Sequence, residues 1–320
     1  MLQRLVAVTL GIILISPVPA SAAPGDRVLI FLCDGLRPDA ITTEHAPRLH
    51  AARQQAAVAP EALCDLPTAT LPNHVSLLTG LEAHRHGILL NTTLPGKVPH
   101  KTIFEFAAAA GLRASFYASK DKLGFVARDE SLVRSRIITA PDQLVPTLLD
   151  DLSEDDPDLI FLHVREPDST GHAQDWMSPA YFAAVSEMDT LFGQVLDALA
   201  RDGRRTYVLV TADHGGFGPS HIFNTPTVRR IPWFVTGPDV AIGPMTQQVV
   251  TIDTMPTALH LLGIDVPTNI DGRARTEVVA AGEGPPTNAP IGPPCLVLPL
   301  GLLMVLLWRA VPNRLARPDR

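Results

Sequence analysis

The stretch YVLVTADHGG, residues 207–216, decides the fold class. Its apolar, β-branched half predicts a buried strand, which ends at Asp213, His214 and two glycines that let the backbone turn. In open α/β sheets the ligand crevice lies just beyond the carboxyl ends of the strands. An adjacent carboxylate and imidazole at such a strand end can bind a divalent metal; the plainer alternative is an Asp that caps a helix beside a solvated His.

Strands alternate with helices along the rest of the chain. The apolar patterns predict helices at 47–57, 75–81, 103–110, 144–152, 179–200 and 255–262, and strands at 27–33, 113–118, 159–164, from Tyr207, and at 231–236. This alternation predicts an α/β fold with a mainly parallel sheet flanked by helices on both faces.

Length and charge limit the class of protein. The chain has 320 residues, and roughly 270 of them lie between two atypical ends, enough for one large α/β domain, which we place at 25–278. The net charge is −7, which matches a nucleic-acid backbone poorly. We therefore expect no groove for a nucleic-acid polymer, although local basic groups could still hold a small phosphate. The sequence leaves the oligomeric state open.

The two ends predict export and anchoring. Residues 1–22 combine an early arginine, an apolar run and a small-residue cleavage site, which indicates a signal peptide, with an uncleaved anchor as the alternative. A Pro/Gly-rich linker at 279–294 leads to an apolar segment at 295–311 and a basic tail at 312–320. This order indicates a C-terminal membrane-anchor or sorting segment, with a buried helix as the alternative. We expect an extracytoplasmic protein, periplasmic or at the cell surface, tethered to the membrane by its C-terminus.

Three cysteines do not make a disulfide framework. Cys33 lies in an apolar run and is predicted to be a core residue. Cys64 can pair with it only if the fold brings the two together.

Metal-capable side chains follow the predicted strands at four places. They are Asp34, Asp168, His172, Asp213, His214 and His221. Asp168 and His172, in EPDSTGH, are expected in the loop after the strand at 159–164. The carboxyl ends of parallel strands meet at one edge of a sheet, so these residues would make two mixed nitrogen and oxygen sites suited to Zn²⁺ or another first-row divalent metal. The alternatives are turn-forming aspartates and solvated histidines, and they weigh most for His221.

Thr70 is the expected nucleophile. It lies between two prolines at the predicted start of a helix, where free N–H groups favour a phosphate. Metal coordination can activate a hydroxyl of this kind. Thr68 is the rival nucleophile, and a plain helix-capping role for Thr70 is the alternative.

Five motifs occur in an order that resembles the alkaline phosphatase superfamily, and most closely its nucleotide pyrophosphatase/phosphodiesterase branch. They are LCDGLRPD, PTATLPNHVSLLTG with AHRHGILLN, EPDSTGH, TADHGG, and DTMPTALHLLGI with DGR. The resemblance extends over residues 28–273.

The resemblance implies two zinc ions that clamp the attacking and leaving oxygens of an in-line displacement. It assigns one ion to Asp34, Thr70, Asp213 and His214, and the other to Asp168, His172 and His221. It implies attack by Thr70, a phospho-threonine intermediate, and hydrolysis of that intermediate by zinc-activated water. It also implies that Asn91 helps to hold a phosphate oxygen, beside the backbone N–H of the nucleophile loop; a turn role is the alternative for Asn91.

The chain departs from the nucleotide-cleaving members of that branch. The positions of their base-stacking aromatic residues correspond to Leu71 and His163, and the segment 213–221 is short where larger members carry an insertion. These departures weaken the case for a nucleotide substrate. Lys120 is expected to be a solvated surface residue, with an approach to phosphate as the alternative.

The site residues and the resemblance together therefore predict a two-zinc phosphodiesterase/pyrophosphatase that acts on a small phosphate-ester substrate. A phosphomonoesterase of the same superfamily is the first alternative, and a non-catalytic surface binding protein with the same fold is the second. A sulfatase is disfavoured because the chain has no C/S-x-P-x-R motif around a nucleophile, and a cofactor-independent mutase because the chain carries an export signal.

Overall fold

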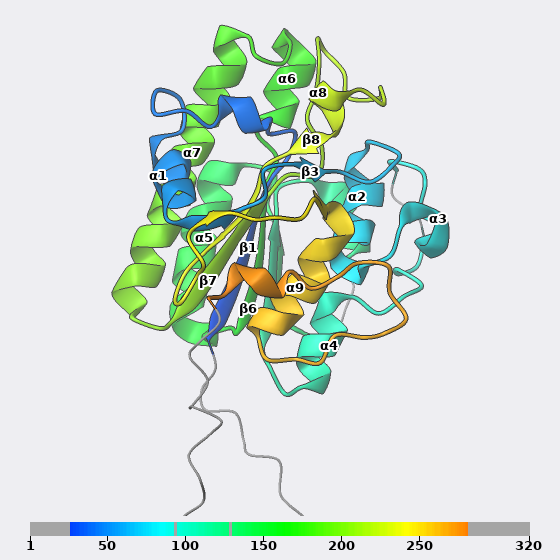
Figure 1. The fold of residues 1–320 in the computed structure, drawn as a ribbon, viewed down its shortest axis with the longest axis vertical. Helices are drawn as coiled ribbons and strands as arrows, with labels where there is room; N and C mark the ends of the chain where they lie inside the picture. Colours follow the sequence, from blue (N-terminus) through cyan, green and yellow to red (C-terminus); the bar gives the residue numbers. More distant parts are fainter. Residues whose placement is uncertain (1–25, 93–94, 128–129, 281–320) are drawn as a thin grey trace, which may run out of the picture. The chain divides into compact units, whose positions relative to one another are not determined.

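Continuous apolar runs form the centre of an eight-stranded sheet in the computed structural model, which describes residues 26–92, 95–127 and 130–280. The strand order is β10-β2-β9-β7-β1-β6-β4-β5 (Figure 1). The strands are β1 Arg27–Cys33, β2 Ala56–Val58, β4 Ala114–Ala118, β5 Leu132–Ile137, β6 Leu159–Val164, β7 Thr206–Thr211, β9 Trp233–Thr236 and β10 Gly243–Pro244. The five strands from β7 to β5 are parallel, and β9 runs antiparallel to β7 and β2. The predicted mainly parallel sheet is confirmed.

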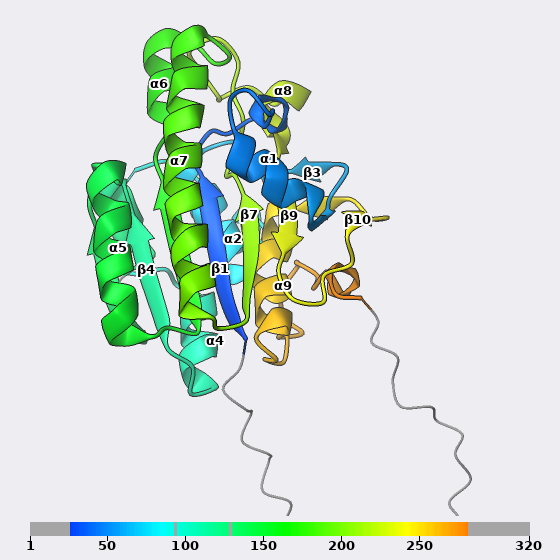
Figure 2. The ribbon, with the colours of Figure 1, turned by 90° about the vertical axis from the view of Figure 1, so that its left-hand side faces the viewer.

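Helices cover both faces of this sheet (Figures 1 and 2). On one face lie α1 Pro47–Gln54, α5 Pro141–Asp155 and α7 Pro179–Asp202; on the other lie α2 Thr70–Thr79, α4 Ile103–Ala109 and α9 Thr254–Leu261. The short helices α3 Ala83–His86, α6 Asp168–Gln174 and α8 Pro226–Arg229 complete the α-helices of the described residues. Four 3₁₀ turns are η1 Pro38–Ala40, η2 Asp121–Phe125, η3 Thr251–Asp253 and η4 Thr276–Val278.

The core lies between the sheet and its helices. Every residue of β1 and of β6 is buried, as expected for parallel strands covered on both faces. In the register of the sheet, Leu32 on β1 lies beside His163 on β6 and Thr211 on β7. The carboxyl ends of these three strands are therefore level with one another.

Several predicted boundaries change for local reasons. Helix α2 begins at Thr70, the helix start expected for the nucleophile, and so extends before the apolar pattern that begins at Val75; Pro72 falls in its first turn, where a missing N–H breaks no hydrogen bond. The expected loop around Asp168 and His172 is wrong, since both residues lie on helix α6. The sequence also gave no sign of the small sheet β11-β3-β8, formed by Val249–Val250, Ala62–Leu63 and Arg230–Ile231, since strands of two residues carry no hydrophobic period.

Cys33 and Cys64 are both buried and free, and Cys33 packs in the core as predicted. The predicted signal peptide, the apolar C-terminal segment, the basic tail and all but the first two residues of the linker lie outside the described residues. Within the described ranges, no helix is long and apolar enough to cross a membrane.

Candidate active site

Three aspartates meet at the carboxyl ends of three neighbouring strands. Asp34 follows β1, Asp168 follows β6 after a short turn, and Asp213 follows β7. The backbone N–H of Asp168 donates to the carbonyl oxygen of Asp34 at 3.0 Å, and the N–H of Gly35 donates to Asp213 Oδ1 at 3.1 Å. All three aspartates are buried. The order of strands in the sheet thus concentrates three acidic groups at one place.

Buried ligand atoms in this cluster have no hydrogen-bond partner. They are Asp34 Oδ1, Asp168 Oδ1, Asp213 Oδ2 and His214 Nε2. A buried polar atom without a partner costs about 1–3 kcal/mol, so such atoms need an explanation. Carboxylate oxygens and imidazole nitrogens are ligands of zinc and of other first-row divalent ions. The residues present therefore fit a divalent metal.

The three histidines expected as ligands direct the same ring atom toward the carboxylates. Each Nδ1 lies against a backbone carbonyl: His172 at 2.9 Å from Pro219 O, His214 at 2.9 Å from Gly215 O, and His221 at 2.6 Å from Thr68 O. A carbonyl oxygen accepts only, so Nδ1 carries the proton in all three rings. The Nε2 lone pairs are left for a metal, and the carbonyls fix the orientation of the rings.

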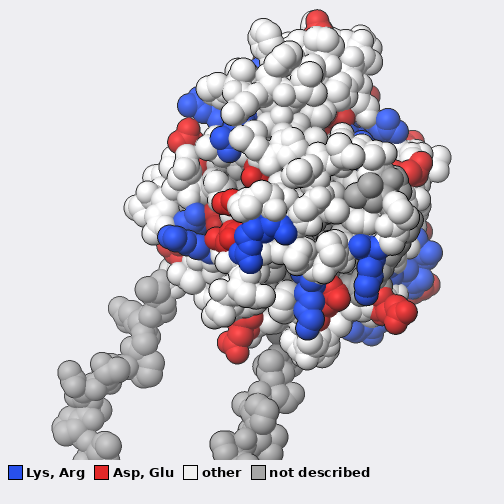
Figure 3. All heavy atoms as spheres, turned by 90° about the vertical axis from the view of Figure 1, so that its right-hand side faces the viewer, with Lys and Arg blue, Asp and Glu red and all other residues white. Residues whose placement is uncertain are grey.

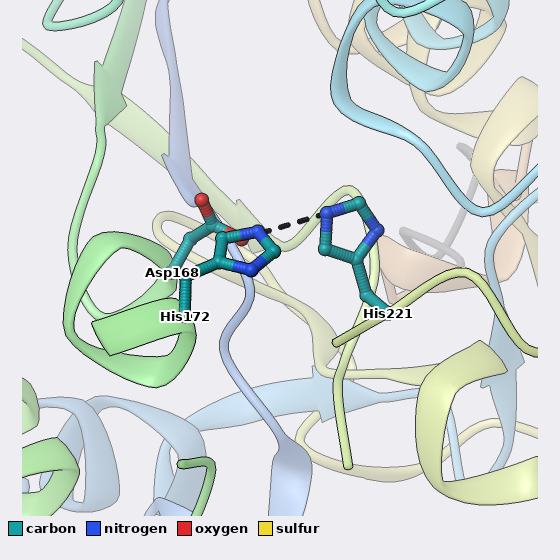
Figure 4. Close-up of side chains that lie close together, drawn as sticks. All are labelled: Asp168, His172 and His221. Carbon is teal, nitrogen blue, oxygen red and sulfur yellow. Dashed lines mark ion pairs between the residues drawn. The ribbon is translucent and has the colours of Figure 1, made fainter. Parts of the chain in front are cut away.

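Two groups of side chains are close enough to hold an ion. Asp168, His172 and His221 form one, and Asp34, Asp168 and His214 form the other, with the ligand atoms of each group within 4.8 Å of one another. Figure 4 shows His172 on the same helix as Asp168, with His221 facing them from a separate loop. Asp168 Oδ1 lies 3.5 Å from His172 Nε2 and 3.9 Å from His221 Nε2.

The second group differs from the set that the resemblance implies. Asp168, rather than Asp213, completes the group with Asp34 and His214. Asp213 still lies beside them, because its Oδ2 is 3.4 Å from His214 Nε2, while its Oδ1 accepts from the N–H groups of Gly35 and His214. Asp168 therefore lies between the two groups, and Asp213 lies at the edge of the second.

Lys120 is a site residue that the sequence interpretation missed. Its Nζ lies 2.6 Å from Asp34 Oδ2 and 2.6 Å from Asp168 Oδ2, and its side chain is only 13% exposed. The expectation of a solvated surface lysine is wrong. Although burial lowers the pKa of Lys120, the two carboxylates raise it above its ordinary value. A signal was present: Lys120 follows strand β4, the neighbour of β6, by the same strand-end rule that selected the aspartates.

His163 also contacts the cluster, from inside the sheet. It lies on β6, is fully buried, and places Nε2 3.0 Å from Asp34 Oδ2. Leu71, the other position expected to correspond to a base-stacking aromatic residue, is fully buried too. Neither residue offers an exposed face on which a nucleobase can stack.

Thr70 is the first residue of α2, and Ala69 occupies the capping position. The alternative in which Thr70 caps the helix is therefore wrong. The hydroxyl of Thr68 donates to His221 O at 2.6 Å, so it is engaged in holding the loop that carries that histidine. Asn73 braces the same turn, since its Nδ2 lies 2.9 Å from Pro67 O.

Asn91 contacts the start of α2. Its Oδ1 accepts from the backbone N–H of Leu71 at 3.0 Å and from Lys122 Nζ at 3.3 Å. This arrangement uses the side-chain oxygen and leaves the side-chain NH₂ as a donor beside Thr70.

The indole of Trp176 packs against all three segments that carry the acidic cluster, the loops after β1 and β7 and helix α6. Trp176 Nε1 donates to Gly35 O at 2.8 Å. A Cβ atom at Gly171 would lie 2.6 Å from the indole, and one at Gly216 would lie 2.1 Å from it. Glycine is required at both positions, because the ring occupies the space that a side chain would need.

Comparison with known proteins agrees with this geometry. The family model described as Type I phosphodiesterase / nucleotide pyrophosphatase matches residues 28–110 and 96–225. Human ectonucleotide pyrophosphatase/phosphodiesterase family member 7 is 28% identical over 218 residues, which cover 59% of this chain and 48% of that protein. A 2,3-bisphosphoglycerate-independent phosphoglycerate mutase of Haloquadratum walsbyi is 27% identical over 218 residues, which cover 59% of this chain and 42% of the mutase.

The fold has solved counterparts. An inactive variant of murine ectonucleotide pyrophosphatase/phosphodiesterase 5 in complex with AMP matches with a TM-score of 0.67 and 16% identity, covering 80% of this chain and all of that one. This likeness concerns the fold. The alignments with the human and archaeal relatives span less than half of their length.

Proposed function

Since the chain belongs to the type I phosphodiesterase / nucleotide pyrophosphatase family, we propose that it is a metal-dependent phosphoric ester hydrolase with Thr70 as its nucleophile. The observation that carries the proposal is the set of buried, unpartnered ligand atoms on Asp34, Asp168, Asp213 and His214, in a protein whose family acts on phosphate esters. The preferred reaction is the hydrolysis of a phosphodiester or pyrophosphate.

The proposed metals are two Zn²⁺ ions, with other divalent ions as alternatives. One would be held by Asp168, His172 and His221. The other would be held by Asp34, His214, Asp213 and the hydroxyl of Thr70. Bound there, divalent ions would offset the charge of the phosphoryl group and favour the deprotonated hydroxyl.

The chain's own residues then have separate tasks. Thr70 Oγ1 attacks phosphorus, and the backbone N–H of Thr70 itself, at the start of α2, can donate to a phosphoryl oxygen. The next N–H groups do not contribute, because Leu71 N donates to Asn91 Oδ1 and Pro72 has no N–H. The side-chain NH₂ of Asn91 donates to one of these oxygens, because its Oδ1 is already engaged. As the threonine ester forms, the bond from phosphorus to the leaving oxygen breaks and the alcohol or phosphate leaves with a proton. In a second step, water breaks the threonine ester, which releases the phosphate product and restores the Thr70 hydroxyl.

Lys120 is proposed as a positioning residue. Its ammonium holds the Oδ2 atoms of Asp34 and Asp168, and the Oδ1 atoms are the ones left without partners. Lys120 therefore orients one carboxylate in each group toward the metal positions. It also places a fixed positive charge beside three carboxylates, which reduces their mutual repulsion before any ion binds.

Two alternatives remain proposals. A phosphomonoesterase would use the same residues, and a non-catalytic surface protein would keep the fold for binding. We also propose that the protein is exported and tethered at its C-terminus, on the basis of the sequence at 1–22 and 295–311.

A metal titration on two matched esters tests the function. The purified chain is stripped of metal and zinc is added back stepwise. At each step, the zinc bound per chain and the turnover of bis-p-nitrophenyl phosphate and p-nitrophenyl phosphate are measured. We expect zinc-dependent cleavage of the diester with two ions per chain. Preference for the monoester would favour the phosphomonoesterase, and zinc binding without cleavage of either ester would favour the binding protein. If the chain neither binds zinc nor cleaves either ester, the proposal that it is a metal-dependent hydrolase is wrong.

A further inference from the structure

Large apolar side chains stand exposed around the candidate active site. Eight such side chains are exposed in the described part of the chain, and six of them come from three loops next to site residues: Leu66, Leu89, Leu90, Phe217, Ile222 and Phe223. The exposed fraction reaches 63% at Leu90 and 75% at Ile222. Val133 and Ile242 lie elsewhere, on β5 and just before β10, at the two edges of the main sheet. Exposed apolar groups gathered at one place indicate a binding surface.

Hydrogen bonds fix these loops to the site. Thr68 and His221 bond to each other twice, from the hydroxyl of Thr68 to His221 O at 2.6 Å and between His221 Nδ1 and Thr68 O at 2.6 Å. These two hydrogen bonds tie the loop of Leu66 to the loop of Ile222 and Phe223.

The other two attachments are equally direct. Phe217 begins a turn closed by its hydrogen bonds with Ser220, and Pro219 in that turn accepts from His172. Leu89 and Leu90 precede Asn91, which accepts from Leu71 N. All three loops are therefore held against the residues that carry the proposed chemistry.

The same loops carry no charge. Residues 66–74, 87–92 and 215–225 contain no Asp, Glu, Lys or Arg, although 18% of the chain is charged. In Figure 3 the charged side chains of the face gather in its lower half, and the upper part, at the height of α8 in Figure 1, is mostly uncharged. A surface of this kind favours an apolar ligand and gives a polar one few partners.

We propose that these six side chains, the apolar rim, bind an alkyl or aryl ester group of the substrate, so that the preferred substrates are amphiphilic phosphate esters. This inference rests on the proposed function, because the loops of the rim carry His221 and are hydrogen-bonded to the segment that carries Thr70. The occupant is the substrate itself rather than a second copy of the chain, since a protein seated on the rim would cover the reacting centre. The absence of an exposed aromatic face at Leu71 and His163 agrees with an apolar group in place of a nucleobase.

A homologous series of substrates tests the rim. Methyl, butyl and octyl p-nitrophenyl phosphate are compared at concentrations below micelle formation, with zinc and the full chain. We expect kcat/KM to rise with chain length by up to about fourfold for each fully buried methylene, from about 0.8 kcal/mol of transfer free energy. The octyl-to-methyl ratio should fall at least tenfold in Ile222→Ser and Phe223→Ser, a ratio that cancels effects common to both esters.

Matched controls are Val133→Ser and Ile242→Ser, which remove exposed apolar side chains of the same kind far from the site and should keep the wild-type ratio. If kcat/KM for the octyl and methyl esters is nearly equal in the wild type, the rim does not bind the alkyl group, while the proposed function stays intact. An equal fall of the octyl-to-methyl ratio in the control variants also contradicts the proposal. So does a sedimentation experiment in which the rim variants dissociate a dimer and keep the wild-type ratio.

If none of the esters is cleaved, the proposed function fails and the rim is judged by binding alone. Calorimetry with octylphosphonate and methylphosphonate then decides. Tighter binding of the octyl compound that is lost in Ile222→Ser supports the rim, and equal binding rejects it.

Discussion

Lys120 Nζ lies 2.6 Å from Asp168 Oδ2, on the opposite oxygen from the one that faces His172 and His221. The same ammonium lies 2.6 Å from Asp34 Oδ2, where His163 Nε2 also approaches to 3.0 Å. Although burial raises the pKa of the Asp34 carboxyl, Lys120 and then His163 hold it well below its usual range. One lysine thus pairs with two buried carboxylates and helps to keep the Asp34 carboxyl ionised.

Replacing Lys120 should destabilise the metal-free protein. Lys120→Met leaves buried carboxylates without their partner, a change that costs about 3–5 kcal/mol. Because a divalent ion restores positive charge there, zinc should raise the melting temperature more in Lys120→Met than in the wild type. Urea unfolding in chelator and thermal melting with and without zinc measure both effects.

Lys122→Met is the matched control for this variant. Lys122 Nζ contacts Asn91 Oδ1 rather than a carboxylate, so the loss of unfolding free energy should be much smaller. A metal-free Lys120→Met as stable as the wild type would show that the lysine does not hold the carboxylates.

The two threonines before α2 should respond differently to removal of the hydroxyl. Thr70→Ala should lower kcat by at least about a thousandfold with little change in zinc content, because the nucleophile is lost while the Asp and His ligands remain. Thr68→Ala should keep turnover and lose about 1 kcal/mol of stability, because the bond to His221 O is removed. Steady-state kinetics, metal analysis and urea unfolding distinguish the two, and retained turnover in Thr70→Ala would reassign the nucleophile.

The sequence predicted those strands and helices whose buried residues produce a clear apolar pattern. The strand at Leu159–Val164 was predicted with both ends correct, because a fully buried parallel strand reads as an unbroken apolar run between polar residues. The strand at Leu132–Ile137 was missed, since it lies at the edge of the sheet and the polar residues 134–136 interrupt its apolar side chains, so that it contains no continuous apolar run.

The sequence predicted only those site residues that come shortly after a predicted strand. The order of β7, β1 and β6 brings Asp34, Asp168 and Asp213 together, and the alternation of strands and helices implies such an edge. Helix α6 was read as a loop because Ser169, Thr170 and Gly171 are common in turns, whereas packing against Trp176 requires the glycine. The strand end before Lys120 was a signal that this residue lies at the same edge, but its contact with Asp34 and Asp168 depends on the pairing of β4 with β6, which no local pattern shows.

An isosteric change at Asn91 separates its two functional groups. Asn91→Asp keeps an oxygen that can accept from Leu71 N and Lys122 Nζ, but it removes the NH₂ donor and adds a negative charge. We expect kcat/KM to fall on the order of a hundredfold, as for loss of one donor to a developing oxyanion, with a melting temperature close to that of the wild type. Unchanged kinetics in Asn91→Asp would remove Asn91 from substrate binding and leave it a turn residue.

Acid should destabilise the protein through His86. Its Nδ1 accepts from Ile88 N at 3.1 Å and its Nε2 lies 3.0 Å from Ser76 Oγ, so the ring is bonded in its neutral form. Burial lowers the pKa of His86 to about 4. In the unfolded chain the pKa is about 6.5, so between these values the unfolded chain binds the proton first and stability falls as the pH falls.

The expected loss from His86 is on the order of 1–2 kcal/mol between pH 7 and pH 5. Urea unfolding of the metal-free protein at the two pH values measures it, and the difference should be smaller in His86→Asn, whose amide oxygen can accept from Ile88 N in place of Nδ1 and which does not titrate. An equal pH dependence in the two proteins would place the acid sensitivity in other groups.

We expect Trp176 to link the stability of the protein to its affinity for zinc. Gly216→Ala places a methyl group where the indole lies, 2.1 Å from its nearest atom, and Gly171→Ala does so at 2.6 Å. The ring must shift, which costs about 1–3 kcal/mol and moves the loop after His214 or the helix that carries Asp168 and His172. Both variants should therefore unfold at lower urea concentration and bind zinc more weakly.

Gly124→Ala is the appropriate control for these variants, because its new Cβ would lie 3.5 Å from Ile137, an ordinary contact. It should change neither property beyond what one added methyl group at an open position causes. If Gly216→Ala loses stability but keeps wild-type zinc affinity, then Trp176 supports the fold without positioning the ligands.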